Sequence, residues 1–496
     1  MCIGAPTFVA REFFMERMRE PASLRSFYHL LDTPLQDVAC NGLACFAARQ
    51  DAPERWAKAC RQTPTVYCLG KCYASPSDSG HDVLPHVSCH ARKSVLLQNV
   101  ADGGVTDLLE YIKRGGGDAR QCALRTSPDD LVKMICASQL RGRGGAGFPA
   151  WRKWQTVAMH AAPRKYLVIN ADEGDPGAFS DRFLMERDPF LLIEGAIVTA
   201  QAIGANAGFV YVRKEYPDAA RVMSEAIVAA RAAGWLGERF DLECVVGAGS
   251  YLCGEETALL NALEGRRPEA RLRPPQVAER GLFGYPTLVH NVETLCCVPW
   301  IAKHGAEAFA ELGFSASRGT KLLSLNSLFN RPGLYEVEFG IGLDALVGKL
   351  GLGLRRGPLK GLMVGGPLAG IVPPALLHTR LGYEEMAAIG CAVGHGGVIA
   401  FANDSSIAAI AAEVFRFGAR ESCGKCTPCR LGIPALAYDF ATAAVPPSPK
   451  QANGIAHDAV IDALATTSLC GHGRGIAEFA RALQRHFPEE WSACRG

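Results

Sequence analysis

The sequence predicts an α/β protein of several domains. At 496 residues the chain is too long for one simple hydrophobic core. Between about 119 and 317, helical patterns alternate with short β-rich runs such as YLVIN at 166–170, FVYV at 209–212 and LECVVGAG at 242–249. Strands that alternate with helices favour a parallel sheet covered by helices. The 19 cysteines, several of them at short spacings, indicate metal ligands.

The composition excludes several classes of partner. A hydrophobic fraction of 48% with 21% charged residues is ordinary for a globular protein, and the net charge of +2 gives no reason to expect nucleic acid or an anionic membrane. The N-terminus, MCIGAPTFVAREFF, lacks the features of a secretory signal, so we expect a cytoplasmic protein with reduced cysteines. Polar residues interrupt the most apolar stretch, 191–212, which therefore predicts a buried helix followed by a strand and no membrane span.

Four regions follow one another along the chain. Residues 1–118 hold closely placed cysteines, and residues 119–320 hold the alternating strands and helices. Residues 321–402 are punctuated by glycine and proline between β-like runs, which predicts a small β-rich module. Residues 403–496 have helical patterns, with the linker AVPPSPKQANG at 444–454.

Three cysteines lie in one short segment near the C-terminus. The segment ESCGKCTPCR at 421–430 spaces Cys423, Cys426 and Cys429 as C-x2-C-x2-C, so one turn can present three sulfurs to a metal cluster. Cys470, in SLCGHGRG, can return as the fourth ligand after a helical hairpin. Four thiolates are the usual ligands of iron–sulfur clusters, whereas structural zinc prefers two C-x2-C pairs. The spacing favours a [4Fe–4S] cluster over zinc.

A glycine-rich segment, LRGRGGAGFPAWRK at 140–153, precedes a helical pattern. Backbone amides can approach a phosphate closely at its glycines, which are Gly142, Gly144, Gly145 and Gly147. Positive charge would come from Arg141, Arg143 and Lys153. Taken alone the segment could also be a simple turn, because no VxGxGxxG strand precedes it.

Two acidic loops follow predicted strands. The first, NADEGDPG, contains Asn170, Asp172, Glu173 and Asp175; the second, GAGSYLCGEETALL, contains Glu255 and Glu256. Ligands bind at the carboxyl ends of strands in α/β sheets. Carboxylates would repel phosphates, so we expect these side chains to face a flavin ring, a ribityl chain or a nicotinamide ribose. The alternative for each loop taken alone is a solvated acidic turn.

Together the motifs resemble the NADH-oxidising flavoprotein subunit of complex I and its soluble relatives. RGRGGAGFP, NADEGDPGAFSDR, GAGSYLCGEETALL, RPP…GLFGYPTLVHNVETL and ESCGKCTPCR…SLCG occur in the family's order between Arg141 and Gly471. The resemblance implies four domains: thioredoxin-like at 1–118, Rossmann-like and FMN-binding at 119–320, β-grasp (SLBB-like) at 321–402, and a helical bundle with the [4Fe–4S] cluster at 403–496.

The resemblance also implies roles for individual residues. FMN would be surrounded by Gly142, Gly144, Gly145, Lys153, Asn170, Asp172, Tyr251, Gly254, Glu255, Asn291 and Thr294. NAD(H) would lie beside Phe148, Glu173, Asp175, Glu256 and Arg273, with Glu173, Asp175 and Glu256 orienting its reacting groups. Gly147 and His290 complete the cofactor-binding set. Gln276 and Thr156 stand where relatives often have aromatic residues, and His290 replaces the first of two asparagines.

Two cysteine pairs lie near the N-terminus. Cys40 and Cys45 in CNGLAC, and Cys68 and Cys72 in CLGKC, resemble the thioredoxin-like [2Fe–2S] domain that accompanies this flavoprotein. The resemblance implies a [2Fe–2S] cluster, and the alternative is a docking domain with free thiols. Cys60 and Cys89 are spare.

Several motifs resemble particular branches of the family. DEGDPGAF, with Asp175, is similar to soluble NAD-linked hydrogenases and formate dehydrogenases. SLNSLFNRPGLYEVEFG at 324–340 and CAVGHGGVIAF at 391–401 are most similar to the beta subunit of NAD-dependent molybdenum or tungsten formate dehydrogenases. This implies partners that hold the Mo/W centre and a small iron–sulfur subunit. The alternatives are the same module serving an NAD-linked [NiFe] hydrogenase or a complex I-like dehydrogenase and, from another class, a zinc- and nucleotide-binding scaffold without redox activity.

Overall fold

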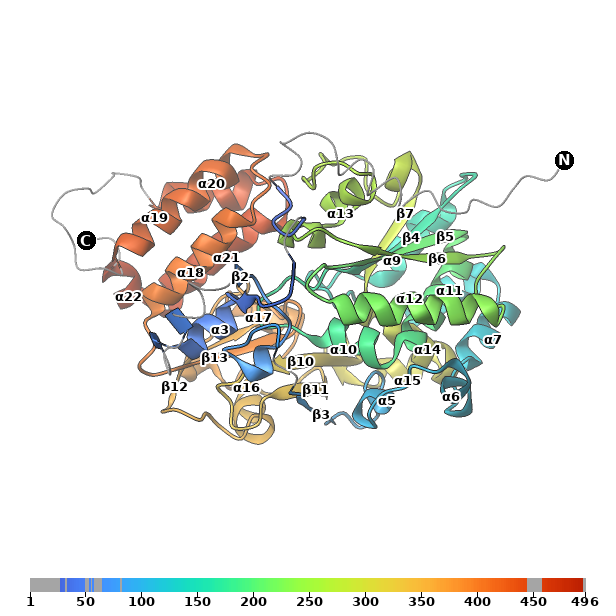
Figure 1. The fold of residues 1–496 in the computed structure, drawn as a ribbon, viewed down its shortest axis with the longest axis horizontal. Helices are drawn as coiled ribbons and strands as arrows, with labels where there is room; N and C mark the ends of the chain where they lie inside the picture. The colour runs from blue at the N-terminus through green and yellow to red at the C-terminus, as the bar shows by residue number, and fades with distance from the viewer. Residues whose placement is uncertain are drawn as a thin grey trace.

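Two larger β-sheets and a helical bundle make up the described part of the chain (Figure 1). A computed structural model describes residues 27–31, 34–49, 53–54, 56–57, 65–80, 83–443 and 457–493. The bundle, in orange and red, lies at one end of the molecule, and the parallel sheet lies toward the other (Figure 1). The mixed α/β class predicted from the sequence is confirmed.

The parallel sheet has four strands in the order β6-β5-β4-β7. Their bounds are Tyr166–Ala171 for β4, Ala207–Val212 for β5, Asp241–Val246 for β6 and Thr287–Asn291 for β7. All three pairings are parallel, so the carboxyl ends of the strands share one edge. At this edge Asn170 of β4 is the register partner of Asn291 of β7.

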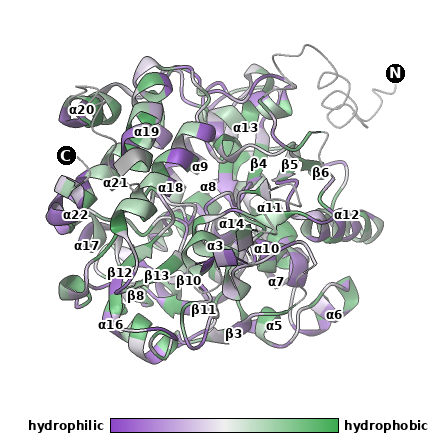
Figure 2. Cartoon of the chain, turned by 60° about the vertical axis from the view of Figure 1, so that its left-hand side comes forward, coloured by the Kyte–Doolittle hydropathy of each residue, from purple (hydrophilic) through white to green (hydrophobic). Residues whose placement is uncertain are grey.

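Helices cover both faces of this sheet. Leu167 of β4 belongs to the hydrophobic cluster that includes α11 (Pro189–Ile203) and α14 (Val292–His304), whereas Val168 belongs to the cluster that includes α13 (Glu256–Leu263). Successive strand residues point to opposite faces, so a strand apolar on every residue needs cover on both. Figure 2 shows α11 in the interior and hydrophilic residues on the outer helix α12 (Pro217–Ala232).

The apolar stretch at 191–212 is a buried helix and a strand, which confirms the prediction. Helix α11 ends at Ile203, Gly204 adopts a left-handed φ of 71°, and β5 begins at Ala207. Among the described residues, no helix is long and apolar enough to cross a membrane.

The polar interruption Glu194 has a structural role. Its buried carboxylate accepts hydrogen bonds from the Tyr111 hydroxyl at 2.7 Å and from the backbone N–H groups of Gly117 at 3.0 Å and Arg120 at 2.8 Å. These amides belong to the start of α7 (Asp118–Arg125), so the carboxylate satisfies donors that a helix N-terminus leaves unpaired.

The second sheet has five strands in the order β12-β13-β10-β11-β3. Their bounds are His86–Cys89 for β3, Thr320–Leu325 for β10, Gly333–Glu338 for β11, Leu359–Val364 for β12 and Gly397–Ala402 for β13. The β-rich character of 321–402 is confirmed. Strand β3 comes from the N-terminal region and pairs with β11, a contact that the division at 118 did not anticipate.

The first cysteine region contains short elements. Strands β1 (Ala39–Cys40) and β2 (Thr65–Val66) pair in parallel, and α3 (Leu43–Ala48) lies against α18 (Ile407–Arg420) of the bundle. Much of 1–82 falls outside the described residues, so the thioredoxin-like fold stays a prediction, as do the four domain boundaries.

Helices form the C-terminal region, as predicted. With α18, the bundle consists of α19 (Ile433–Ala443), α20 (His457–Thr467), α21 (Gly471–His486) and α22 (Pro488–Ala493). A π-helical turn at Pro428–Gly432 precedes α19. The predicted linker at 444–454 lies outside the described residues.

Candidate functional site

The glycine-rich loop lies against the carboxyl edge of the parallel sheet, before α9 (Ala150–Met159). A Cβ added to Gly144 would lie 3.0 Å from Cβ of Asn291, and one added to Gly147, whose φ is +58°, would lie 2.6 Å from the Tyr383 ring. Gly145 has φ +123°, a conformation that side chains rarely adopt. These approaches require glycine and bring the loop amides to the edge of the sheet.

The two arginines of this loop serve the fold. Arg143 is buried, and its guanidinium donates to the carbonyls of Arg141 at 3.0 Å and Arg318 at 2.7 Å. Arg141 pairs with Glu384 at 2.6 Å and stacks on Tyr383. These contacts with protein groups do not favour the expectation that Arg141 and Arg143 supply positive charge to a bound phosphate.

Lys153 faces the second acidic loop. Its Nζ lies 2.7 Å from Oε2 of Glu256, and Arg273 reaches the other oxygen of Glu256 at 3.0 Å and Oε1 of Glu255 at 2.6 Å. Burial tends to raise the pKa of Glu256, but the Lys153 and Arg273 cations outweigh it and hold that pKa below its usual value. Glu255 also caps α13 by accepting from the amides of Thr257 and Ala258.

The first acidic loop follows β4 at the same edge. The Asn170 side chain donates to the carbonyl of Gly254 at 2.8 Å, which joins the two acidic loops. Oδ2 of Asp172 is buried without a hydrogen-bond partner among the described residues, and burial raises the pKa of this carboxyl well above its usual value. An unpaired buried acceptor is costly unless a ligand supplies a donor, so Asp172 fits the ring edge of a flavin.

Tyr251 connects this edge to the bundle. Its hydroxyl donates to Oδ1 of Asp175 at 2.7 Å, its amide donates to Glu421 at 3.0 Å, and its ring packs on Phe417 with centroids 4.9 Å apart. Burial raises the pKa of Asp175. Tyr251 therefore links the acidic loops at the sheet edge to the helical bundle.

Two predicted residues make contacts that differ from the expectation. Glu173 is 1% exposed, and its carboxylate faces α10 (Ser180–Arg187) and His395 instead of open space. His290 is buried, and its Nε2 accepts from Nε1 of Trp154 at 2.8 Å. Burial lowers the pKa of His290 to about 3, so the ring is neutral.

Two further predicted residues, Asn291 and Thr294, contact the glycine loop or the start of α14. Asn291 caps α14 by accepting from the amide of Thr294 at 3.3 Å, and the Thr294 hydroxyl accepts from the amide of Arg143 at 2.8 Å. Phe148, which follows the glycine loop, is 45% exposed. Asn291 and Thr294 therefore hold the glycine loop at the sheet edge.

The four C-terminal cysteines gather at the base of the bundle. Cys423 and Cys426 lie between α18 and the π-helical turn, Cys429 lies within that turn, and Cys470 precedes the N-terminus of α21. Burial, together with the neighbouring thiols of the quartet, raises the pKa of Cys429 to about 12 and that of Cys470 to about 11. Buried thiols near one another are stable as thiolates only with a metal, and the positive end of α21 favours such a thiolate. The donor set fits an iron–sulfur cluster.

The four N-terminal cysteines also gather, in buried surroundings. Sγ of Cys68 and Sγ of Cys72 are 3.4 Å apart, and Cys40 interacts with both Cys45 and Cys68. The spare Cys89 lies on β3, and Cys60 lies outside the described residues.

Sequence reasoning missed three residues that shape the site. Tyr383 donates from its hydroxyl to the carbonyl of Gly142 at 2.9 Å. Asp181 and His395 lie 2.9 Å apart beneath Asn291. Tyr383 and His395 come from the β-rich module, and no local pattern indicates that this module lies beside the glycine loop.

Comparison with known proteins gives the class. Residues 135–300 match the Nuo51 FMN-binding domain, and residues 409–494 match the iron–sulfur binding region of NADH-ubiquinone oxidoreductase-F. These ranges contain the loops and the C-terminal cysteines described above. The chain is therefore an FMN- and iron–sulfur-binding oxidoreductase subunit.

Individual relatives give the family. The chain is 36% identical to the F component of NADH-quinone oxidoreductase of Aquifex aeolicus (strain VF5), over 84% of this chain and 97% of the relative. It is 43% identical to the F 2 component of the same type of enzyme in Rhizobium meliloti (strain 1021), over 68% and 83% of the two chains. It is also 36% identical to the NADP-reducing hydrogenase subunit HndC of Solidesulfovibrio fructosivorans, over 77% and 80%. The chain belongs to the family of the NADH-quinone oxidoreductase F component.

A solved structure extends this likeness to the whole chain. The NAD+-reducing [NiFe]-hydrogenase in its H2-reduced state contains a chain that superposes with a TM-score of 0.83 at 28% identity, covering 98% of this chain and 93% of that one. The superposed part therefore includes described residues before 135, outside both domain matches.

Proposed function

We propose that this chain is the diaphorase subunit of an NAD-dependent formate dehydrogenase, reducing NAD⁺ with electrons from formate oxidised at a partner's molybdenum or tungsten centre. The observation that carries the diaphorase part is the convergence of Lys153, Asn170 and the Gly254–Glu256 loop at one sheet edge, with Tyr251 linking that edge to the cysteine bundle. FMN, when bound, exchanges a hydride with NAD(H) and single electrons with clusters.

Different residues at this edge of the sheet would bind different parts of FMN and NAD(H). Glycine-loop amides and Lys153 would hold phosphate, while Asn170 and Asp172 would meet the flavin and its ribityl chain. Phe148, Glu256 and Arg273 would orient NAD(H). Asp175 would act through Tyr251, whose hydroxyl donates to it. Glu173 would support the loop from below.

The formate assignment rests on resemblance in 324–340 and 391–401. The hydrogenase alternative is favoured by the structural likeness over 98% of the chain. Purification of the native complex separates them: molybdenum or tungsten with formate-dependent NAD⁺ reduction supports the first, and nickel with hydrogen-dependent reduction supports the second. A colourless protein without flavin or iron would support a zinc-binding scaffold and contradict both.

We also propose a [2Fe–2S] cluster at Cys40, Cys45, Cys68 and Cys72, supported by the two contacting thiol pairs. Iron content and EPR of Cys68→Ser should show the loss of a [2Fe–2S] signal, while Cys89→Ser keeps it. An identical spectrum in both variants would instead support a docking domain with free thiols.

A further inference from the structure

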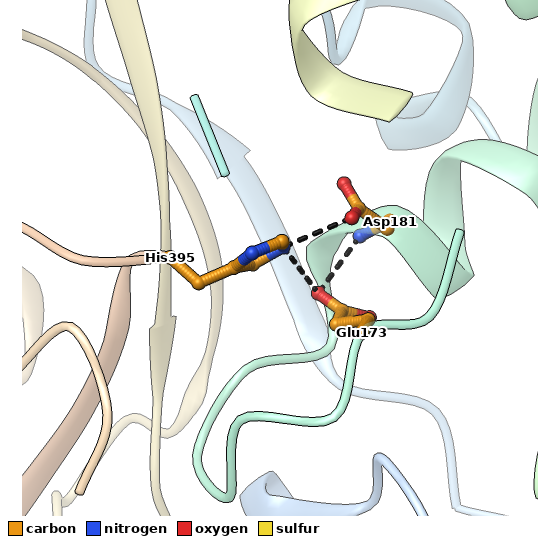
Figure 3. A group of neighbouring side chains, drawn as sticks. All are labelled: Glu173, Asp181 and His395. Atoms are coloured by element: carbon orange, nitrogen blue, oxygen red, sulfur yellow. Dashed lines mark hydrogen bonds and ion pairs between the residues drawn. The ribbon is translucent and has the colours of Figure 1, made fainter. Parts of the chain in front are cut away.

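His395 lies between two buried carboxylates (Figure 3). Its Nε2 is 2.9 Å from Oδ2 of Asp181 and 3.3 Å from Oε1 of Glu173. The same Glu173 oxygen accepts from the backbone N–H of Asp181 at 3.0 Å, so the three residues form a closed group. Glu173 and Asp181 are at most 1% exposed, and His395 is 7% exposed.

The group joins two regions of the fold. Glu173 and Asp181 belong to the parallel-sheet region, and His395 belongs to the β-rich module just before β13. Beside it, Lys321 of β10 forms a buried ion pair with Glu293 of α14 and donates to the carbonyl of His395 at 3.0 Å. Two cations of the module therefore face three carboxylates of the other region.

Ligand atoms of the three residues lie within 4.8 Å of one another, which would also suit a metal ion. The carboxylate oxygens, however, already have donors. Glu173 accepts from the hydroxyls of Ser180 and Tyr216 and from the amide of Arg182, and Asp181 accepts from Asn291 and Glu293. Because these oxygens already accept hydrogen bonds, we infer that a proton, and not a metal ion, lies between the three side chains.

The imidazole carries that proton. Burial would lower the pKa of His395, but the Asp181 and Glu173 carboxylates raise it well above its usual value. Glu173 keeps a lowered pKa despite its burial because His395 and the amides of α10 stabilise its charge. The interface therefore contains an imidazolium fixed by two carboxylates.

This charge is coupled to the flavin side of the sheet edge. Asp181 accepts from Nδ2 of Asn291 at 2.5 Å, and Asn291 is in contact with the glycine loop at Gly144. Gly394, the residue before His395, forms an isolated β-bridge with Gly145. His395 thus reaches the proposed flavin surface through one side-chain contact and one backbone contact.

We propose that His395 is a positioning residue of the flavin site whose positive charge raises the midpoint potential of the bound flavin; this rests on the proposed function. A hydride carries two electrons and one proton, so a neutral flavin that accepts it gains one negative charge, while the nicotinamide that gives it becomes positive. A fixed cation on the flavin side favours that transfer by Coulomb attraction in a medium of low dielectric constant.

The test is a spectroelectrochemical titration of flavin in the whole purified protein. His395→Gln retains a hydrogen-bond donor toward Asp181 but removes the charge. We expect it to bind FMN and to shift the flavin–NADH equilibrium about tenfold toward oxidised flavin, which is about 30 mV lower for a two-electron couple. His378→Gln, an exposed histidine of the same module, should leave the potential unchanged.

A second variant should shift the midpoint potential of the flavin in the opposite direction. Asp181→Asn removes a negative charge and leaves Glu173 as the counter-ion of His395, so the potential should rise. A fall in both variants would indicate general disruption of the site and overturn the proposal, as would an unchanged potential in a flavin-loaded His395→Gln protein. A non-iron metal bound once per chain and lost in His395→Gln would overturn it too. Wild-type protein that binds no FMN would contradict the proposed function itself.

Discussion

Lys153 and Glu256 form an ion pair across 103 positions of sequence, with Nζ and Oε2 2.7 Å apart. Arg273 holds the second oxygen of the same carboxylate. The two cations and the carboxylates of Glu255 and Glu256 thus balance at the mouth of the candidate site. The Glu256 carboxylate thereby fixes the positions of Lys153 and Arg273.

We expect Glu256→Gln to raise the KM for NADH about tenfold, which corresponds to about 1.4 kcal/mol for one charge-assisted contact. The amide cannot fix Lys153 and Arg273 as the carboxylate does, so the nucleotide meets a less ordered site. FMN content should stay at the wild-type level. Glu225→Gln, which removes an exposed carboxylate paired with Arg221, is the control and should leave both values unchanged. An unaltered KM in Glu256→Gln would remove this residue from the NAD(H) site.

Cys470→Ser should abolish the C-terminal cluster while preserving the fold around it. Cys470 is the N-cap of α21 and makes no side-chain capping bond, and serine is a good N-cap, so the helix should persist. Loss of one thiolate should remove the iron of the [4Fe–4S] cluster, measured by iron analysis and EPR, and should stop NADH-driven reduction of a viologen dye. Full iron content in the variant would show that a residue other than Cys470 is the fourth ligand of the cluster. The exposed Cys136→Ser is the matched control.

Local patterns were sufficient for much of the fold and part of the site. The apolar run before Gly204 and the aromatic and β-branched run after it predicted α11 and β5, because burial on both faces leaves a continuous signal. The C-x2-C-x2-C spacing identified three cysteines that the structure does place together. The glycine loop and both acidic loops, each noted from its sequence pattern, lie at one edge of the sheet, since parallel strands present their carboxyl ends there.

Long-range contacts could not be predicted in the same way. Arg143 is as basic in sequence as Lys153, but only the fold shows that Arg143 is buried against backbone carbonyls. Likewise, β3 completes a sheet whose nearest strand lies more than 200 residues along the chain, and His395 meets Glu173 and Asp181 from another region. Such pairings depend on how the domains pack, and one sequence carries no periodic signal of that.

Glu336 anchors the N-terminal region to the second sheet. Its buried carboxylate accepts from the amides of Val95, Leu96 and Leu97 and from the hydroxyls of Ser94 and Thr320, at distances from 2.8 to 3.1 Å. In Glu336→Gln the amide group would face one or more of these donors. We expect a loss of about 3 kcal/mol in the free energy of unfolding, because buried donors lose a charged acceptor.

Chemical denaturation of the two variants Glu336→Gln and Glu338→Gln would measure this. Glu338 lies two residues away on the same strand, and its partner Arg92 is largely exposed, so its substitution should cost under about 1 kcal/mol. Equal losses in the two variants would show that the amide contacts of Glu336 contribute little.

His290 should make the stability of the protein depend on pH. Its Nε2 accepts from Trp154 and must therefore be unprotonated in the folded state, where burial lowers the pKa to about 3 from a usual value of 6.5. Above about pH 6.5 the ring is neutral in both states, and its contribution is fully present. As the pH falls from about 6.5 to about 3, the unfolded chain binds a proton that the folded chain does not, so stability declines.

The decline from this one group should reach about 2 kcal/mol at pH 5, at about 1.4 kcal/mol for each unit below 6.5. His290→Gln keeps an acceptor for Trp154 and removes the titrating ring, so its stability should fall less than that of wild type between pH 7 and pH 5. Urea denaturation at these two pH values measures the difference, with His378→Gln as the control for loss of an exposed histidine. Because every other carboxyl and thiol titrates identically in the two proteins, parallel pH profiles for His290→Gln and wild type would mean that the buried ring accepts a proton in the folded state.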